Sequence, residues 1–112
     1  MTSPVLNRQL VLEAPQRVSD GAGGFTQSWV ALGSLWAEVK PGSGRERDGG
    51  VLTVSRVPYR ITVRGAPEGS NARPTPEQRF REGSRVFDIL AVTERDQHGH
   101  FLTCFAEEEQ SA

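Results

Sequence analysis

Apolar and polar residues alternate with a period of two over much of this chain, which is the spacing of half-buried β-strands. The clearest run is 56–64, where the apolar face comprises Val57, Tyr59, Ile61 and Val63. Pro58 cannot donate to a sheet ladder, so it predicts an edge position or a bulge near the start of this strand. The same alternation predicts further strands at 7–14, 25–30, 34–40, 85–93 and 101–107.

Turn-forming residues separate these strands. Pro15 is expected to end the first strand, and Ser19–Gly24 forms a hairpin tip because its Asp-Gly and Gly-Gly pairs supply positive backbone angles. The first 40 residues therefore predict a meander of three strands. Pro41 ends the third, because it cannot donate to a ladder.

The remaining segments read as loops. Residues 45–55 combine charges, Gly49-Gly50 and β-branched residues, which predicts a mobile loop with at most one helical turn. Residues 65–76 are too polar and prolyl for a core, and Thr75 with Pro76 predicts a helical turn over 76–80. Residues 94–100 form a polar hairpin tip. The acidic tail that begins at Glu107 is expected to fray.

About six short strands with frequent turns predict an all-β protein, a small antiparallel barrel or sandwich. A chain of 112 residues is expected to form one domain over 1–112. Its hydrophobic content of 36% and its 12 glycines predict a thin core that gains stability on association with other subunits.

The composition limits the classes of function. A formal net charge of −1 gives no overall attraction to DNA or to a membrane. The basic residues are almost all arginines, which suit fixed ion pairs between subunits but also fit a GC-rich coding background. No signal peptide or membrane span is expected, so assembly is expected in the cytoplasm.

No motif supports catalysis, a metal or a cofactor. Cys104 lies among apolar neighbours and is expected to be a buried, inert thiol. His98 and His100 could share one face, but a metal site needs further ligands and this run is expected to be a solvated turn. Nucleophile-elbow, nucleotide-binding and zinc-protease motifs are absent from the sequence. The chain is therefore predicted not to be an enzyme.

Two groups of residues are candidates for contacts with partners. Arg56, Arg60 and Arg64 share one strand face, which is either a solvated surface, an inter-subunit contact with the carboxylates Glu107 and Glu108 of a neighbour, or a DNA-backbone contact. Core packing is the default expectation for Trp36, with a role as interface anchor as the alternative, because it shares its face with polar residues.

The glycine-rich, charged loop that follows residue 41 is the strongest functional candidate. Its residues are Gly42, Ser43, Gly44, Arg45, Glu46 and Arg47. Glycines allow movement and charges keep the loop out of the core, so it can serve as a contact or gating element; the alternative is a plain surface connection.

The order of several short motifs resembles the bacteriophage head–tail joining (head-completion) proteins over nearly the whole chain. The matching segments are Asp20–Trp29, Leu35–Val39, Ser43–Glu46, Tyr59–Arg64, Arg85–Leu90 and Phe101–Glu108. The sequence departs from that family at Gly49-Gly50, where a more helical segment is usual, and in the longer 65–76 loop.

This resemblance implies a structural subunit at the neck of a phage, prophage or gene transfer agent particle. Six or twelve copies would form a ring below the portal or adaptor and above the tail terminator or tail tube, with DNA passing through without sequence-specific binding. The 42–47 loop would then be the contact or gating element that closes the channel, and no membrane is involved. The alternative is a small OB- or SH3-like barrel that binds nucleic acid through Arg56, Arg60 and Arg64.

Overall fold

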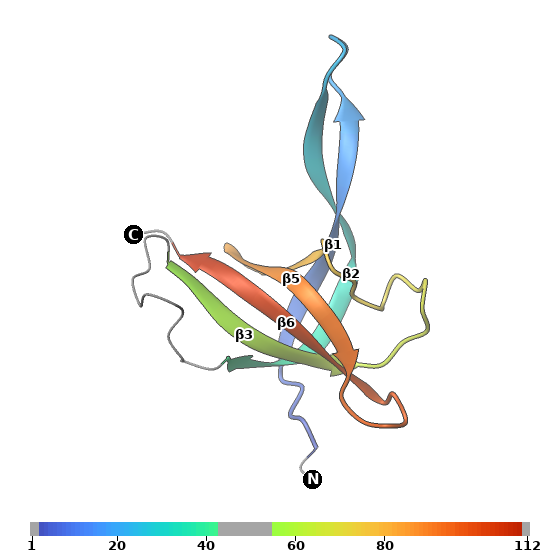
Figure 1. The fold of residues 1–112 in the computed structure, drawn as a ribbon, viewed down its shortest axis with the longest axis vertical. Coiled ribbons are helices and arrows are strands. Elements are labelled where there is room, and N and C mark those ends of the chain that lie inside the picture. The colour runs from blue at the N-terminus through green and yellow to red at the C-terminus, as the bar shows by residue number, and fades with distance from the viewer. Residues whose placement is uncertain (1–2, 43–54, 111–112) are drawn as a thin grey trace.

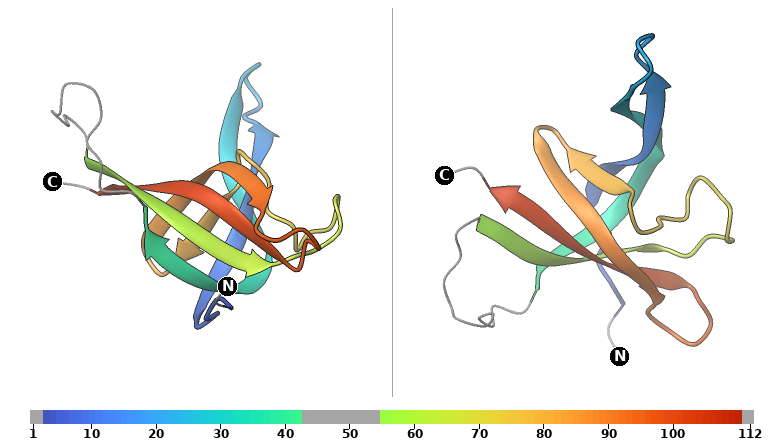
Figure 2. Two further views of the ribbon diagram at one scale, coloured as in Figure 1. Left: turned by 60° about the horizontal axis from the view of Figure 1, so that its bottom comes forward. Right: turned by 45° about the horizontal axis from the view of Figure 1, so that its top comes forward.

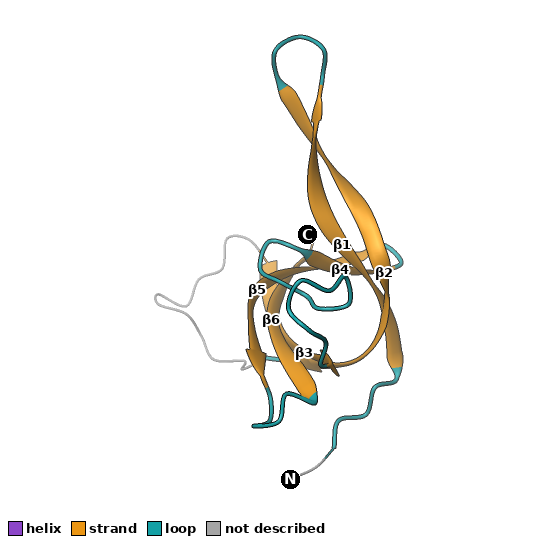
Figure 3. Cartoon of the chain, turned by 90° about the vertical axis from the view of Figure 1, so that its right-hand side faces the viewer, coloured by secondary structure: helices purple, strands orange, loops and turns teal. Residues whose placement is uncertain are grey.

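The computed structural model describes residues 3–42 and 55–110, and these form six antiparallel strands without a helix (Figure 1). The strands are β1 (Arg8–Ser19), β2 (Phe25–Pro41), β3 (Ser55–Arg64), β4 (Arg79–Glu82), β5 (Arg85–Glu94) and β6 (Phe101–Gln110). Neighbours in the sheet follow the order β1-β2-β3-β6-β5-β4, and β4 pairs back onto β1. The result is a closed barrel, visible as a ring in Figure 3. The all-β prediction is confirmed.

The barrel interior is filled by side chains. Alternate residues of every strand point inward and are buried: Leu10, Leu12, Ala37, Ile61, Val63, Phe80, Phe87, Ile89, Leu102, Cys104 and Ala106. Eight strands enclose a space that side chains just fill, so six enclose less. The inside of this barrel is therefore a core and offers no passage.

Two predicted strands are one continuous strand. β2 runs without a break from Phe25 to Pro41, so the first 40 residues form two strands, and the predicted three-stranded meander is wrong. A β-bulge shifts the β1–β2 register between Leu12 and Glu13, opposite Gly33 and Ala31. A bulge bends a strand without ending it, which explains why glycine here does not mark a turn.

Pro15 does not end β1, contrary to the prediction; the strand continues to Ser19. The amide of Asp20 donates to the Gly24 carbonyl, so from there every second residue pair of the arm is joined by backbone hydrogen bonds. This alternation puts the nitrogen of Pro15 on the outer edge of β1, beyond the point where β4 pairs. No ladder bond is lost at that edge.

A β-turn stands where a helical turn was predicted. The amide of Gln78 donates to the Thr75 carbonyl at 3.2 Å, and Glu77 has a φ of 80°. Proline followed by a positive φ is the geometry of a type II turn. This turn leads straight into β4, a strand that sequence patterning had missed because only four residues form it.

The predicted loop over 65–76 is confirmed; the irregular segment extends to residue 78 and passes across one end of the barrel (Figure 3). Pro74 of this loop is fully buried. Gly65 starts the loop, where its amide donates to the His100 carbonyl at 2.8 Å. A Cβ at position 65 would lie 2.0 Å from the Gly99 carbonyl oxygen, so only glycine fits there.

The first residues of the acidic tail are part of the sheet. Glu107 and Glu108 lie in β6, opposite Pro58 and Val57 of β3, so the prediction that the tail frays from Glu107 is wrong. Each carboxylate has an arginine partner, Arg56 for Glu107 and Arg85 for Glu108. These ion pairs help to hold both glutamates in the strand.

Candidate functional site

The most exposed part of the described chain is a two-stranded arm, residues 14–30, which projects from the barrel in all views (Figures 1 and 2). The radius of gyration is 15.5 Å, against about 13 Å for a compact chain of similar length. One arm face carries no charge and consists of Ala14, Gln16, Val18, Thr26, Ser28 and Val30. The other carries Phe25 and Trp29, with the Arg17 guanidinium 4.4 Å from the Phe25 ring centroid.

A charged clamp holds the base of the arm against the barrel. Glu13, only 5% exposed, accepts hydrogen bonds of 2.7 Å from the Nε atoms of both Arg79 and Arg81. Burial alone would raise the pKa of Glu13, but the hydrogen bonds from Arg81 and Arg79 outweigh it and the pKa is lowered. The Arg79 guanidinium also stacks 4.0 Å from the Trp29 ring centroid. The first residues of the arm are therefore fixed in direction.

A second charge network closes one end of the barrel interior. Arg8 donates to Glu82, with Nε to Oε2 at 3.0 Å, and Arg85 donates to Glu108 at 2.7 Å and to the Tyr59 hydroxyl at 3.3 Å. The hydrogen bond from Arg8 lowers the pKa of Glu82 against the opposing effect of burial. The bond to Glu108 raises the pKa of Arg85. Sequence patterning missed this network, although Arg85 and Glu108 stand at inward positions of their alternating strands.

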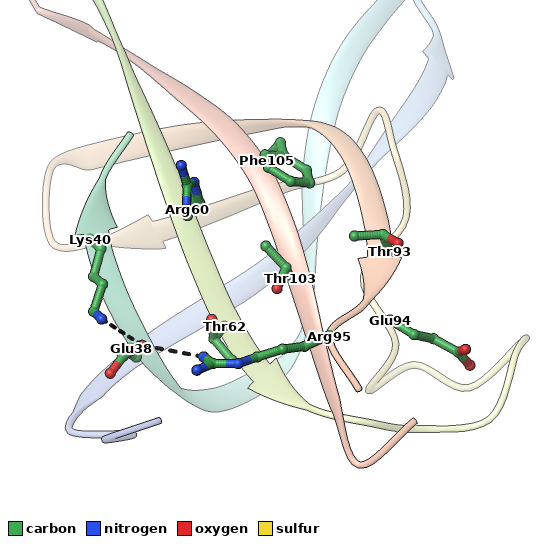
Figure 4. Close-up of a pocket in the computed structure, with 9 residues that line it drawn as sticks. All are labelled: Glu38, Lys40, Arg60, Thr62, Thr93, Glu94, Arg95, Thr103 and Phe105. Carbon is green, nitrogen blue, oxygen red and sulfur yellow. Dashed lines mark ion pairs between the residues drawn. The ribbon is translucent and has the colours of Figure 1, made fainter. Parts of the chain in front are cut away.

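The outer face of β2, β3, β6 and β5 contains an open groove of about 580 Å³ (Figure 4). Strand pairing places Glu38, Thr62, Thr103 and Thr93 in one row across it. Glu38 accepts from the Val5 amide at 2.9 Å and lies 3.7 Å from Arg95 and 3.8 Å from Lys40. Arg60 and Phe105 line the same groove, so a cation and an exposed ring stand side by side there.

The three arginines of the predicted face all lie on β3, but they differ in their ion pairs. Arg56 pairs within the chain, at 2.8 Å from Glu107 and 3.5 Å from Asp88. Arg60 and Arg64 are exposed and form no ion pair with a described residue. Glu107 therefore already has a partner in its own subunit, and the role of these residues between subunits stays a prediction.

The other predicted contact residues lie apart from this groove. Trp36 is 55% exposed, so it is not a core residue, and it lines a small hollow with Arg64. Glu108 is 6% exposed and faces Arg85 inside the barrel end. Gly42 donates to the Pro58 carbonyl at 2.8 Å. Ser43, Gly44, Arg45, Glu46 and Arg47 lie outside the described residues, so the contact or gating loop stays a prediction.

The candidate reactive groups, as far as the structure describes them, are not arranged in a way that supports a reaction. Cys104 is fully buried, and burial raises its pKa to about 12. His100 lies 3.3 Å from Asp96 in an exposed turn. Among the residues of ranges 3–42 and 55–110, no three His, Cys, Asp or Glu side chains are grouped as metal ligands. The described part of the chain also contains no helix able to cross a membrane.

The described residues form a small closed barrel with a projecting arm, and Glu13, Glu107 and Glu108 are paired with arginines. Residues 1–109 match the family described as phage head completion protein. The chain belongs to this family, as its motif order had indicated.

Comparisons with solved structures agree. The chain is similar to a chain of the virion of a native gene transfer agent particle, with 59% identity, a TM-score of 0.83, and coverage of 98% of this chain and 100% of that chain. It also resembles the solution structure of protein SF1141 from Shigella flexneri 2a, at 21% identity and a TM-score of 0.67, over 96% of both chains. The second likeness concerns the fold alone. No curated protein matched the sequence.

Proposed function

We propose that this protein is a non-enzymatic subunit of the neck of a tailed phage-like particle, where it joins the DNA-filled head to the tail. The observation that carries the proposal is the family match over residues 1–109, together with 59% identity to a chain of a gene transfer agent virion. Several copies form a ring, below the portal or its adaptor and above the tail terminator or tail tube.

The filled barrel supports a ring of several copies. A core packed with Phe80, Phe87 and Ile61 leaves no passage through one subunit. DNA that leaves the head must therefore run between copies, along an axis that several barrels surround. Closed barrels also lack long open sheet edges, so each copy forms a rigid unit around that axis.

The electrostatics support a structural role over a catalytic one. Hydrogen bonds lower the pKa of Glu13 and of Glu82, and both carboxylates stay ionised near neutral pH. A general acid or base needs a pKa near the working pH, and these are shifted away from it. Glu13, Glu82 and Glu108 form ion pairs with arginines of other strands and so fix strands to one another.

Electron microscopy of particles made with and without the gene tests this proposal. Loss of the protein is expected to give separate tails beside tailless heads that are empty or leak DNA. Normal tailed particles in its absence would refute the neck role. Complementation with the wild-type gene must restore tailed particles, which controls for effects on neighbouring genes.

Two finer parts of the proposal need their own tests. Closing of the channel by residues 42–47 predicts that a deletion of 42–50 leaves a folded protein but prevents formation of mature particles. Nucleic-acid binding, the second candidate, rests on Arg60 and Arg64, which are exposed and lack a described ion-pair partner. A mobility assay at low salt with Arg60→Ala as control tests it, and unchanged DNA mobility with the wild-type protein removes this candidate.

A further inference from the structure

Exposed large apolar side chains are concentrated in two distant places. Val18, Phe25 and Val30 lie on the arm and are 43%, 60% and 40% exposed. Leu90 and Phe105, 54% and 41% exposed, lie on the outer side of β5 and β6, and we refer to these two residues as the wall patch. The remaining two are Trp36 and Val5.

The wall patch lies at a β-bulge. Ile89 pairs with Ala106 and Ala91 pairs with Phe105, so Leu90 is an extra residue without an opposite partner on β6. Leu90 is exposed next to Ala91, the residue that pairs with Phe105, and Phe105 lines the groove together with Arg60 (Figure 4). Bulges recur in proteins where a side chain is aimed at a site.

The arm has the features of a docking surface. A two-stranded hairpin by itself is only marginally stable in water, and from Pro15 to Ser28 every arm residue except Gly24 is exposed. Residues 25–37 contain no charged side chain, so the outer edge of β2 in the arm has no lysine or proline to repel another chain. On the other edge, Pro15 blocks strand addition.

The arm cannot reach the wall patch of its own chain. β1 and β2 of the arm pair only with each other, and the arm points away from β5 and β6 (Figures 1 and 2). A contact between two different patches is heterologous, and it gives a ring when the rotation between neighbouring copies closes. The charges also match, because Asp20 at the arm tip is exposed and Arg60 lacks a described ion-pair partner.

We infer that the arm of each copy packs on the wall patch of the next copy, with the uncharged face of Val18 and Val30 against Leu90 and Phe105. This inference rests on the proposed ring. It names which surfaces of two copies of this chain meet. Asp20 of one copy lies near Arg60 of the next in this arrangement.

The area of the arm face determines under which conditions this contact is stable. Six residues of strand span about 20 Å and two strands are about 10 Å wide, so one arm face covers roughly 200 Å². A stable pair of proteins buries about 800 Å² on each partner. One arm contact is therefore too small to hold two free copies together. It forms where many copies are held around an axis, so the test is done in particles.

Cysteine cross-linking in purified particles tests the inference. A Val18→Cys, Leu90→Cys double variant, treated with a short bismaleimide, is expected to give a ladder of covalent multimers of this chain. The control, Val5→Cys with Leu90→Cys, uses an exposed apolar residue outside the arm and is expected to stay monomeric. The native Cys104 does not interfere, because it is fully buried.

Each other outcome overturns the inference. Multimers from Val18→Cys alone would mean that arms meet one another, and cross-links from Val18→Cys to a different virion protein would mean that the arm binds another component. No cross-link in particles that contain the protein would refute the arm contact and leave the neck role intact. Particles that lack the protein would refute both.

A second variant checks the contact without cysteines. Val18→Glu puts a charge on the uncharged arm face and is expected to abolish incorporation into particles, while the unfolding midpoint of the purified protein stays unchanged. Val5→Glu is the matched control and is expected to be incorporated normally. Normal incorporation of Val18→Glu would contradict the inference.

Discussion

The barrel and the arm are formed in part by the same two strands, yet their residues are stabilised in different ways. In the barrel, Leu10 and Leu12 of β1 are fully buried and every strand has two neighbours. Six residues further on, Val18 of the same strand is 43% exposed, and the strand has one neighbour. Glu13 marks the boundary, where Arg79 and Arg81 clamp it. One strand thus supplies both part of the buried core and part of an exposed surface.

Truncation of a central barrel residue is expected to have the largest effect on stability. Phe87 is fully buried and packs edge-on against Tyr59, with ring centroids 5.2 Å apart. Phe87→Ala removes this packing and leaves a cavity, so we expect a loss of about 3–5 kcal/mol in the free energy of unfolding, measured by denaturant titration. The matched arm variant Phe25→Ala should change it by less than about 0.5 kcal/mol. Equal effects would contradict the comparison.

Loss of Arg85 is expected to have the second largest effect on the free energy of unfolding. Arg85→Met keeps the apolar stem but leaves Glu108, 6% exposed, without the guanidinium that Arg85 provides. Breaking a buried ion pair by removing one partner costs about 3 kcal/mol or more, and some exposure of Arg85 reduces this. A double variant with Glu108→Leu should recover part of the loss in the same titration. A larger loss in the double variant would mean that the two residues do not act as a pair.

Glycine 65 should tolerate no side chain. Gly65→Ala places a Cβ 2.0 Å from the Gly99 carbonyl, so the loops around residues 65 and 99 must separate. We expect a loss of about 1–3 kcal/mol in the free energy of unfolding. Gly65 does not have a positive φ, so crowding is the expected cause of this loss, whereas Gly21→Ala at the arm tip would be strained by a φ of 80° with no atom within 4 Å of its Cβ position. Unchanged stability of Gly65→Ala would contradict the close approach to Gly99.

Acid should weaken the clamp at the arm base. The pKa of Glu13 is lowered in the folded protein, so its contribution to stability is full above the ordinary value of 4.5 and is lost as the pH falls through the folded value. Glu13→Gln should therefore destabilise the protein at pH 7 and much less at the acid end of the range. Unfolding midpoints measured from pH 7 downward check this, and a constant difference between the variants would contradict it.

Shortening of the arm should have the smallest effect on stability and a complete effect on assembly. Replacing residues 17–27 by Asn-Gly closes the hairpin on the pair Gln16 and Ser28, a position suited to a two-residue turn. The unfolding free energy should change by less than about 1 kcal/mol, because every removed residue except Gly24 is exposed. Heads and tails should stay separate, as is expected without the gene, and should lack the variant. Normal incorporation would show that the arm has no role in the neck.

Sequence patterning predicted the barrel better than the arm for a physical reason. Strands with one buried face, such as β3 and β5, carry their alternation in the sequence, and their positions were confirmed. The arm buries neither face, so its residues lack that signal and its length was underestimated. The bulge opposite Gly33 and the type II turn at Glu77 depend on backbone geometry that the residue pattern alone does not encode.

Ion pairs were the least predictable part of the candidate site. The sequence left Trp36 between core packing and an interface anchor, and its exposure of 55% excludes the first. The arginine face was located correctly on β3. Yet whether Arg56 meets Glu107 of its own chain depends on β3 pairing with β6, a contact between residues 51 apart. The uncharged stretch 25–37 was available as a signal for the arm, since a soluble surface strand of that length usually carries charges.

The strand order also decides when each part of the molecule can form. The arm is a local hairpin, and hairpins form within about 1–10 μs, whereas the barrel needs β6, the last strand in the sequence, to pair with β3. Pairing of distant segments slows folding. The arm, with its uncharged face, can thus form while the rest of the chain is still open, and neighbouring newly made chains can associate through it prematurely. Yield of soluble protein should therefore fall steeply with expression rate and temperature, and the shortened arm should relieve that dependence.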